Sequence, residues 1–233
     1  MAKKLVVFTG AGMSADSGLS TFRDADGLWD KYKIEDVCTP EALQRNPALV
    51  NEFYNIRRKE LLAAKPNAGH YAIADLEKYY EVEVITQNID DLHERAGSTH
   101  VTHLHGELRK VRSSIDENLI YDVDGWEVKI GDKCEKGSQL RPFVVFFGEP
   151  VPMFEKAIEI TSKAEILVVV GTSLNVYPAA SLLYYADKKI PVYVVDPHIP
   201  DIRNISNPLV TIPKRAAVGM PELRDRLIAE TKK

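Results

Sequence analysis

Short apolar segments that alternate with helical ones constrain the fold of this 233-residue chain. The apolar segments are rich in valine and isoleucine, as are strands buried on both faces of a parallel sheet. This alternation predicts an α/β fold, a Rossmann-like parallel sheet with helices on both faces. The expected strands are Lys4–Thr9, Glu81–Thr86, His100–Leu104, Arg141–Phe147, Ile166–Val170, Pro191–Val195 and Leu209–Ile212. The expected helices lie within Pro40–Ala64, Asn67–Tyr79, Pro152–Ala164, Tyr177–Asp187 and Pro221–Lys232, with Pro47 as a break or a helix start.

The stretch Arg109–Leu140 has a different character. It is polar and contains glycines and short alternating pieces such as LIYDV and WEVKI. This pattern predicts a small β-rich insert. We therefore expect a large Rossmann-like part built from residues 1–30, 80–108 and 141–233. A small inserted domain would combine residues 31–79, which are helical, with residues 109–140.

The charge and composition exclude several classes of protein. The net charge of −4 and the pI of about 5.9 give no support for a nucleic-acid or membrane partner. No apolar run is long enough to span a bilayer, and the first residues lack the features of a signal peptide. Two cysteines, Cys38 and Cys134, are too few for a disulfide framework. We therefore expect a reduced, cytoplasmic protein, and nothing in the chain demands more than a monomer.

Polar segments follow several expected strands, where the carboxyl ends of parallel strands line a ligand crevice. Gly10, Gly12 and Ala15 fit the glycine fingerprint of a dinucleotide site. The polar segment Ser20–Gly27 follows them, whereas a dehydrogenase would continue into a helix and a second strand. The alternative for the glycines after the first strand is a tight turn without a ligand. Gly171-Thr172-Ser173 forms a second such turn, and two turns of this kind can bracket a pyrophosphate.

Other strand ends carry side chains suited to binding. Asp196 could accept a hydrogen bond from a ribose hydroxyl, or could form an Asx turn before Pro197. Gln87, Asn88 and Asp90 together suit a neutral ligand that both donates and accepts hydrogen bonds, such as a carboxamide. The alternative for the acidic residues is the capping of a helix.

His103 and His105 share one face of an extended chain, because a single residue separates them. Three interpretations remain open from the residues alone. They could be a structural pair, a metal-binding pair, or a pair that contains one general base.

Six motifs, in this order, resemble the sirtuin family of NAD-dependent protein-lysine deacylases. They are GAGMSADSG, STFRDADGLW, TQNIDDLHERAG, HLHGE, VVFFGE and GTSLNVYPAA, between Gly10 and Ala180. The resemblance implies that the whole chain is one sirtuin-type catalytic unit with NAD as cofactor. In such enzymes the acyl-lysine oxygen attacks the ribose as nicotinamide leaves, and a histidine removes a proton from a ribose hydroxyl. The products are free lysine, nicotinamide and O-acyl-ADP-ribose.

The resemblance also assigns roles to positions of this sequence. His105, which directly precedes glycine, matches the catalytic base, and Asn88, Asp90 and Arg23 are expected to act with it. Phe22 and Arg23 match a mobile cofactor-binding loop that closes over the ligand. The extended acyl-lysine peptide would pair with the edge formed by Val145, Phe147, Gly148 and Glu149. The expected cofactor-binding residues are Gly10, Ala11, Gly12, Ala15, Phe22, Arg23, Gln87, Asn88, Ile89, Asp90, Gly171, Thr172, Ser173, Asp196 and Ala216.

The segment LVNEFYNIRRKELL raises the question of the acyl group. At helical spacing Arg57 falls in the apolar stripe of Val50, Phe53, Tyr54 and Leu61. The position of Arg57 in this stripe would be explained if its side chain extends to the solvent or pairs with a nearby acid. Tyr54 and Arg57 also resemble the tyrosine and arginine that contact the acyl carboxylate in desuccinylase-type sirtuins. That resemblance implies a preference for succinyl, malonyl or similar acidic groups, with acetyl as a second substrate.

The chain departs from the family in its small insert, where many sirtuins bind zinc through four cysteines. Ser113 stands at one cysteine position, and Cys134 alone remains of the second pair. A tetrahedral thiolate site cannot be built from these residues. We therefore expect no metal and an insert held by its own β-pairing and by apolar contacts such as those of Trp126 and Ile120.

Two other functions use the same cofactor site. The protein could transfer ADP-ribose to a protein side chain, or it could be a non-catalytic sensor of NAD or ADP-ribose. The presence of His105, Asn88 and Asp90 disfavours a sensor, and the Tyr54 and Arg57 pair disfavours a transferase.

Overall fold

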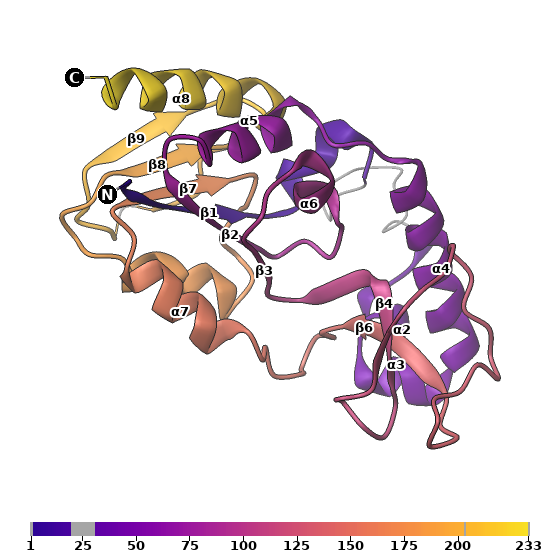
Figure 1. Cartoon of the computed structure of the whole chain (residues 1–233). Helices are drawn as coiled ribbons and strands as arrows, with labels where there is room; N and C mark the ends of the chain where they lie inside the picture. Colours follow the sequence, from indigo (N-terminus) through magenta and orange to yellow (C-terminus); the bar gives the residue numbers. More distant parts are fainter. Residues whose placement is uncertain (1, 20–30, 203, 233) are drawn as a thin grey trace.

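The computed structural model describes residues 2–19, 31–202 and 204–232 (Figure 1). Within these residues a six-stranded parallel sheet has the order β3-β2-β1-β7-β8-β9. The order reverses beside β1, and the carboxyl ends of β1, β2 and β7 therefore lie next to one another. The strands are β1 (Lys4–Thr9), β2 (Glu81–Thr86), β3 (Val101–His103), β7 (Ile166–Val170), β8 (Val192–Val195) and β9 (Leu209–Ile212).

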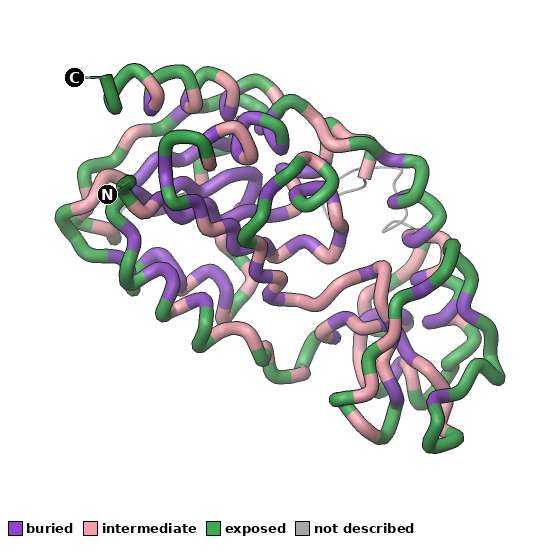
Figure 2. Tube along the Cα trace, viewed as in Figure 1, coloured by how far each residue is buried: buried purple, intermediate pink, exposed green. Residues whose placement is uncertain are grey.

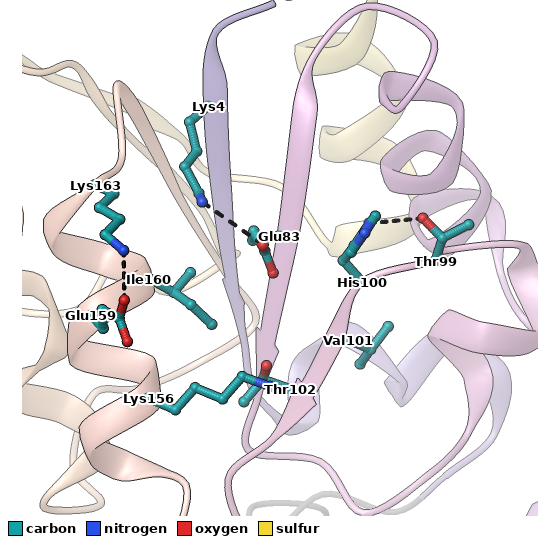
Figure 3. Close-up of a pocket in the computed structure, with 10 residues that line it drawn as sticks. All are labelled: Lys4, Glu83, Thr99, His100, Val101, Thr102, Lys156, Glu159, Ile160 and Lys163. Atoms are coloured by element: carbon teal, nitrogen blue, oxygen red, sulfur yellow. Dashed lines mark hydrogen bonds and ion pairs between the residues drawn. The ribbon is translucent and has the colours of Figure 1, made fainter.

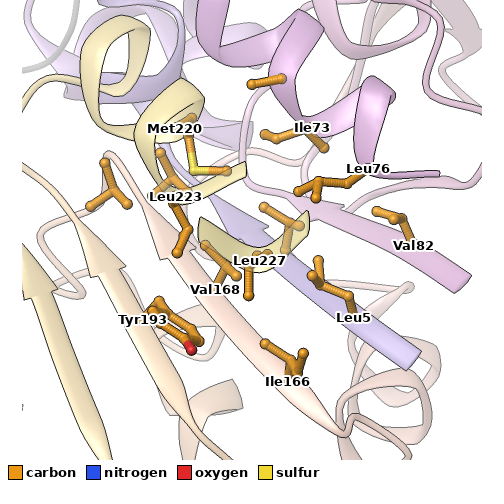
Figure 4. Close-up of a cluster of buried hydrophobic side chains, with 14 of the residues drawn as sticks. Leu5, Ile73, Leu76, Val82, Ile166, Val168, Tyr193, Met220, Leu223 and Leu227 are labelled. Carbon is orange, nitrogen blue, oxygen red and sulfur yellow. The ribbon is translucent and has the colours of Figure 1, made fainter. Parts of the chain in front are cut away.

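Helices cover both faces of this sheet. On one face α5 (Ala68–Leu76) and α8 (Ala216–Glu230) pack over the strands. Figure 4 shows their contact layer, in which Leu76 and Leu223 lie among strand residues such as Leu5 and Val168. On the other face α7 (Phe154–Ser162) and the 3₁₀ helix η3 (Ala179–Tyr185) form a second apolar layer. The central strands are almost wholly buried (Figure 2), which explains their continuous apolar sequence.

A smaller part of the molecule projects from the carboxyl ends of the strands (Figure 1). It contains a three-stranded antiparallel sheet of order β5-β4-β6, packed against helix α4. Phe53 and Leu61 of this helix share a buried cluster with Leu108 and Phe146. Its elements are α2 (Ile34–Val37), α3 (Pro40–Arg45), α4 (Pro47–Ala63), β4 (Gly106–Ser113), β5 (Ile120–Asp122) and β6 (Leu140–Val144).

The structure confirms the predicted strands of the main sheet and the helix start at Pro47. Three predictions about single elements were wrong. The strand expected over Arg141–Phe147 is not part of the parallel sheet: it pairs antiparallel with β4 in the small sheet and ends at Val144. The helix expected from Tyr177 is a 3₁₀ helix, in which Ser181 N–H donates to the carbonyl three residues before it. The last helix was predicted to begin at Pro221. It begins five residues earlier, at Ala216, and Pro221 lies inside it.

Two serine hydroxyls lie beside the Cys134 thiol, at the place where the sirtuin resemblance would lead one to expect a zinc site. Ser113 Oγ lies 2.9 Å from Ser138 Oγ and accepts hydrogen bonds from the backbone N–H groups of Ile115 and Asp116, both at 3.2 Å. The Cys134 thiol lies 3.4 Å from Ser113 Oγ and 3.2 Å from Ser138 Oγ. No group of three or more potential metal ligands among His, Cys, Asp and Glu occurs in the described ranges.

The apolar contacts predicted for the insert were placed on the wrong residues. Trp126 and Ile120 are 39% and 42% exposed, whereas Val111, Val123 and Val128 form the buried cluster. Trp126 lies at the surface, with the ammonium of Lys59 5.3 Å from the centre of its ring. The boundaries proposed for the two domains stay a prediction.

Candidate active site

One cavity of about 610 Å³ opens at the carboxyl ends of β1, β2 and β7 and reaches the small inserted domain. All the predicted site residues that the structure describes line it. Phe22 and Arg23 lie outside the described residues. The lining set includes Gly10, Ala11, Gly12, Ala15, Tyr54, Arg57, Gln87, Asn88, Ile89, Asp90, His105, Val145, Phe147, Gly148, Glu149, Gly171, Thr172, Ser173, Asp196 and Ala216.

The loops that follow β1 and β7 are in direct contact at the floor of the cavity. Gly12 N–H donates to the carbonyl of Gly171 at 2.8 Å. A Cβ at Gly10 would lie 2.7 Å from the Cβ of Thr172, and Gly171 has φ +60°. Only glycine allows this approach without displacing the opposite loop. The result is a backbone surface free of side chains, which suits a pyrophosphate.

His105 is held in one tautomer by its contact with the loop after β2. Its Nδ1 lies 3.0 Å from the carbonyl oxygen of Gln87. A carbonyl only accepts, so Nδ1 carries the proton and Nε2 keeps its lone pair. Nε2 makes no hydrogen bond within the described part of the chain. Burial lowers the pKa of His105, which keeps the ring neutral at pH 7 and ready to accept a proton.

His103 has a different environment. Its Nδ1 lies 3.0 Å from the carbonyl of Asn88, and its Nε2 lies 2.7 Å from the Glu94 carboxylate. Both partners accept, so a charged ring satisfies both contacts. Burial opposes that charge, but the hydrogen bond and the charge of Glu94 outweigh it and raise the pKa of His103. Of the three interpretations of the pair, the geometry favours one general base, His105, beside a structural ion pair.

Asn88 and Asp90 belong to a buried polar network. Asn88 Nδ2 donates to the carbonyl of Gly10 at 3.0 Å and to Ser14 Oγ at 3.2 Å. Ser14 Oγ donates to Asp90 at 2.9 Å, and the other Asp90 oxygen accepts from Leu92 N–H. Burial raises the pKa of Asp90. Asn88 Oδ1 makes no hydrogen bond within the described residues, so this side chain still offers an acceptor to a carboxamide.

Tyr54 and Arg57 lie on successive turns of α4 and both line the cavity. Tyr54 Oη lies 3.5 Å from Cys38 Sγ, and burial raises the pKa of both groups, so both stay neutral. The stripe predicted for α4 is confirmed for its apolar members. The fully buried cation of this helix is Arg58 rather than Arg57, which is half-buried in the cavity wall.

The carboxylate of Glu149, a predicted substrate-binding residue, is bound by neighbouring groups of the protein itself. The carboxylate lies 2.7 Å from Arg141 Nη1 and accepts the Phe146 N–H at 2.8 Å. Burial opposes the charge, but these bonds lower the pKa of Glu149. Glu149 therefore fixes the turn at Phe147 and Gly148. The Phe147 N–H donates to the carbonyl of Cys38 at 2.9 Å, so the Phe147 carbonyl and the Gly148 main chain remain the candidates for peptide pairing.

At the nucleotide end, Asp196 Oδ1 accepts the His198 N–H at 2.8 Å, which is the Asx turn considered as its alternative role. Sequence reasoning missed Ser14, Cys38 and Arg215 as lining residues. Ser14 lies within the glycine motif, and its hydroxyl was the available signal. Cys38 and Arg215 approach through tertiary packing, which no local pattern reveals.

A second, smaller cavity of about 430 Å³ lies between α7 and the strands β1, β2 and β3 (Figure 3). Its charges are largely paired with one another: Lys4 lies 3.8 Å from Glu83 and Lys163 lies 2.5 Å from Glu159. It contains none of the predicted site residues. Among the described residues, no helix has both the length and the apolar character needed to cross a membrane.

Comparison with known proteins decides the family. The sequence model of the Sir2 family matches residues 10–178. The chain belongs to the Sir2 family. It is 56% identical over 231 residues to an NAD-dependent protein deacylase of Bacteroides thetaiotaomicron, with 97% of this chain and 98% of that protein covered. A Helicobacter pylori protein of the same name is 48% identical over 228 residues, with 97% and 98% covered.

Solved structures of Sir2 homologues share the whole fold. One, in complex with NAD, has a TM-score of 0.89 at 38% identity and covers 99% of this chain and 91% of that one. A Sir2 mutant with a deacetylated p53 peptide and 3′-O-acetyl ADP-ribose has a TM-score of 0.81 at 32% identity, with 98% and 94% covered. The predicted family and fold class are confirmed. The relatives are NAD-dependent enzymes and a Sir2 homologue binds NAD, which confirms the predicted cofactor.

Proposed function

We propose that the protein is an NAD-dependent protein-lysine deacylase that favours succinyl, malonyl and similar acidic groups and accepts acetyl as a second substrate. One observation supports this more than any other. A single cavity is lined by His105, whose Nε2 has no hydrogen-bond partner among the described residues, by the Asn88–Asp90 network and by the Tyr54 and Arg57 side chains. The names of the relatives support the deacylase activity, and the acyl preference rests on Tyr54 and Arg57.

The residues of the cavity fit NAD. The glycine surface of the β1 and β7 loops would hold the pyrophosphate, and Asn88 and Asp90 would hold the carboxamide. When bound, NAD supplies an ADP-ribosyl group that gives up nicotinamide and accepts the acyl group. His105 would take a proton from a ribose hydroxyl at Nε2, since Nδ1 is committed to Gln87. Gln87 in turn donates to Thr172 at 3.0 Å and thereby joins the β2 and β7 loops.

Acidic acyl groups suit the wall formed by α4. A guanidinium binds a carboxylate through two parallel hydrogen bonds, and the Tyr54 hydroxyl can donate a third. Burial raises the pKa of Tyr54, so its hydroxyl keeps the proton that it would donate. An acetyl group offers no charge to either side chain, and it would bind through the remainder of the pocket.

The test compares succinyl and acetyl versions of one peptide, with NAD, in the wild type and in Arg57→Met. We expect Arg57→Met to lower kcat/KM for the succinyl peptide by at least about 10- to 150-fold, since each of the two charged hydrogen bonds that it removes is worth about 1.5–3 kcal/mol. Acetyl turnover should change little. Lys59→Met is the matched control, because Lys59 lies on the same helix against Trp126 and does not line the cavity. An equal loss on both peptides would overturn the acyl preference. If the wild type removes the acyl group from neither peptide, the proposed deacylase activity is overturned.

A further inference from the structure

Three successive main-chain carbonyls of the loop after β2 are held by one short segment of the chain. The carbonyls are those of Gln87, Asn88 and Ile89. Their donors are His105 Nδ1 at 3.0 Å, His103 Nδ1 at 3.0 Å and Leu108 N at 2.7 Å, respectively. The backbone of the loop that lines the cavity is therefore fixed at three successive residues, in addition to the hydrogen bonds that its Gln87, Asn88 and Asp90 side chains make.

Leu108 belongs to an irregular stretch of β4. The pairing of β4 with β6 is interrupted between the Gly106 and Val111 pairs. Leu108 N–H and C=O therefore both bond to groups outside the small sheet. The N–H donates to Ile89, and the carbonyl accepts Arg58 Nε at 2.8 Å. One residue thus connects the loop of the cavity to a buried guanidinium on α4.

Arg58 is fully buried and forms no ion pair with a carboxylate in the part of the chain that the structure describes. Its Nη1 donates to the carbonyl of Trp126 at 2.7 Å and to Asn55 Oδ1 at 2.6 Å, and its Nη2 has no partner there. Burial, with a contribution from the charge of Arg109, lowers its pKa to about 10, so it is charged at pH 7. A buried charge that has no counter-ion among the described residues is destabilising by itself, so this guanidinium calls for a role.

Attachment of the insert to α4 does not account for this charge. Asn51 and Asn55 already bind the backbone of Val128, Asn55 both as donor at 2.9 Å and as acceptor at 3.0 Å. The neutral side chains of Asn55 and Asn51, about one and two turns before Arg58, therefore already attach the insert to α4. Arg58 is the residue of this row that reaches Leu108.

We propose that Arg58 is a positioning residue for the nicotinamide end of the site. It fixes the Leu108 carbonyl, and Leu108 N–H then fixes Ile89 between Asn88 and Asp90. The inference rests on the proposed function, since it assumes that this loop binds nicotinamide. Loss of Arg58 would therefore weaken nicotinamide binding more than peptide binding, because the hydrogen bonds of Arg58 run to Leu108, Asn55 and Trp126 rather than to the proposed acyl-binding wall of Tyr54 and Arg57.

The test measures exchange of labelled nicotinamide into NAD in the presence of acyl peptide. Arg58→Met should raise the half-saturating nicotinamide concentration by about 2- to 12-fold, as expected for the loss of one hydrogen bond of about 0.5–1.5 kcal/mol. The KM for the peptide should stay near its wild-type value. Arg58→Lys keeps a donor for Leu108, so its half-saturating nicotinamide concentration should lie between those of the wild type and of Arg58→Met. Asn51→Ala is the control, because it weakens the attachment to Val128 without touching Leu108.

The outcomes separate the two levels of inference. A wild type that exchanges no nicotinamide would refute the proposed function itself. A wild type that exchanges, with unchanged nicotinamide dependence in Arg58→Met, would refute the positioning role. The same role is refuted if Asn51→Ala raises the nicotinamide requirement equally, since Arg58 would then only attach the insert. If Arg58→Met does not fold, Arg58→Lys alone decides, and a wild-type nicotinamide dependence in that variant overturns the proposal.

Discussion

His105 Nδ1 donates a hydrogen bond to the carbonyl oxygen of Gln87 across 3.0 Å, which leaves the lone pair of the ring on Nε2. Gln87 belongs to the loop that also contains Asn88 and Asp90. The contact therefore couples the orientation of the base to the segment that we propose binds nicotinamide. Both lie at the ends of neighbouring strands, β2 and β3, and this places them on one side of the cavity.

Replacement of His105 should abolish most of the activity. His105→Ala removes the proton acceptor, and we expect kcat/KM to fall by about 10²- to 10⁴-fold. Because burial lowers the pKa of His105, the acid limb of the wild-type kcat/KM profile should have its midpoint below about pH 6.5. His100→Ala, at an exposed histidine, should behave as the wild type. A midpoint above the ordinary histidine value would contradict the assignment of His105 as the base.

Tyr54→Phe should reduce selectivity for acidic acyl groups. The variant keeps the ring that stacks on Phe146 at 5.8 Å and removes only the hydroxyl. We expect the ratio of succinyl to acetyl kcat/KM to fall by about 10- to 150-fold. The matched control is Tyr80→Phe, which removes a buried hydroxyl that donates to Leu227 at 2.8 Å, far from the site. A fall in the ratio of the same size in Tyr80→Phe would show that the effect comes from stability.

The His103–Glu94 pair should make stability depend on pH. The folded pKa of His103 is raised, so its contribution is complete below the unfolded value of about 6.5 and disappears as pH rises through the folded pKa. Urea unfolding of the wild type and His103→Gln should differ by about 1 kcal/mol at pH 6 and by less at pH 9. His100→Gln provides the comparison. A difference that grows with pH would mean that His103 is neutral in the folded protein.

The insert should be stable without metal. Hydrogen bonds connect Ser113, Ser138 and Cys134 at the place where the resemblance would lead one to expect a zinc site. We expect less than about 0.1 zinc per chain, by elemental analysis, and an unchanged melting temperature in a chelator. Ser138→Ala should lower the unfolding free energy by about 1 kcal/mol. One tightly bound zinc per chain would refute this prediction.

Local patterns predicted the sheet and the convergence of the site. Gly10-Ala11-Gly12 and Gln87-Asn88-Ile89-Asp90 each follow an apolar strand, and parallel strands bring such ends together without further information. The resemblance then supplied the roles of single residues, which spacing alone had left open for His103 and His105.

What could not be predicted depends on tertiary contacts. Arg57 and Arg58 are one position apart on α4, a rotation of about 100°, and both flank a broad apolar stripe. Only the packing of Leu108 and Trp126 against the helix shows that Arg58 is the buried one. Cys38 meets Tyr54 because α2 packs against α4, and nothing in its own segment indicates that contact.

The stoichiometry of one reaction tests the central claim most directly. The wild type is incubated with NAD and a succinyl-lysine peptide, and nicotinamide release and peptide mass are followed together. The account predicts one nicotinamide for each peptide that loses its succinyl group, with the acyl group recovered on ADP-ribose. Nicotinamide release with a peptide that gains ADP-ribose, or no release at all, would contradict it.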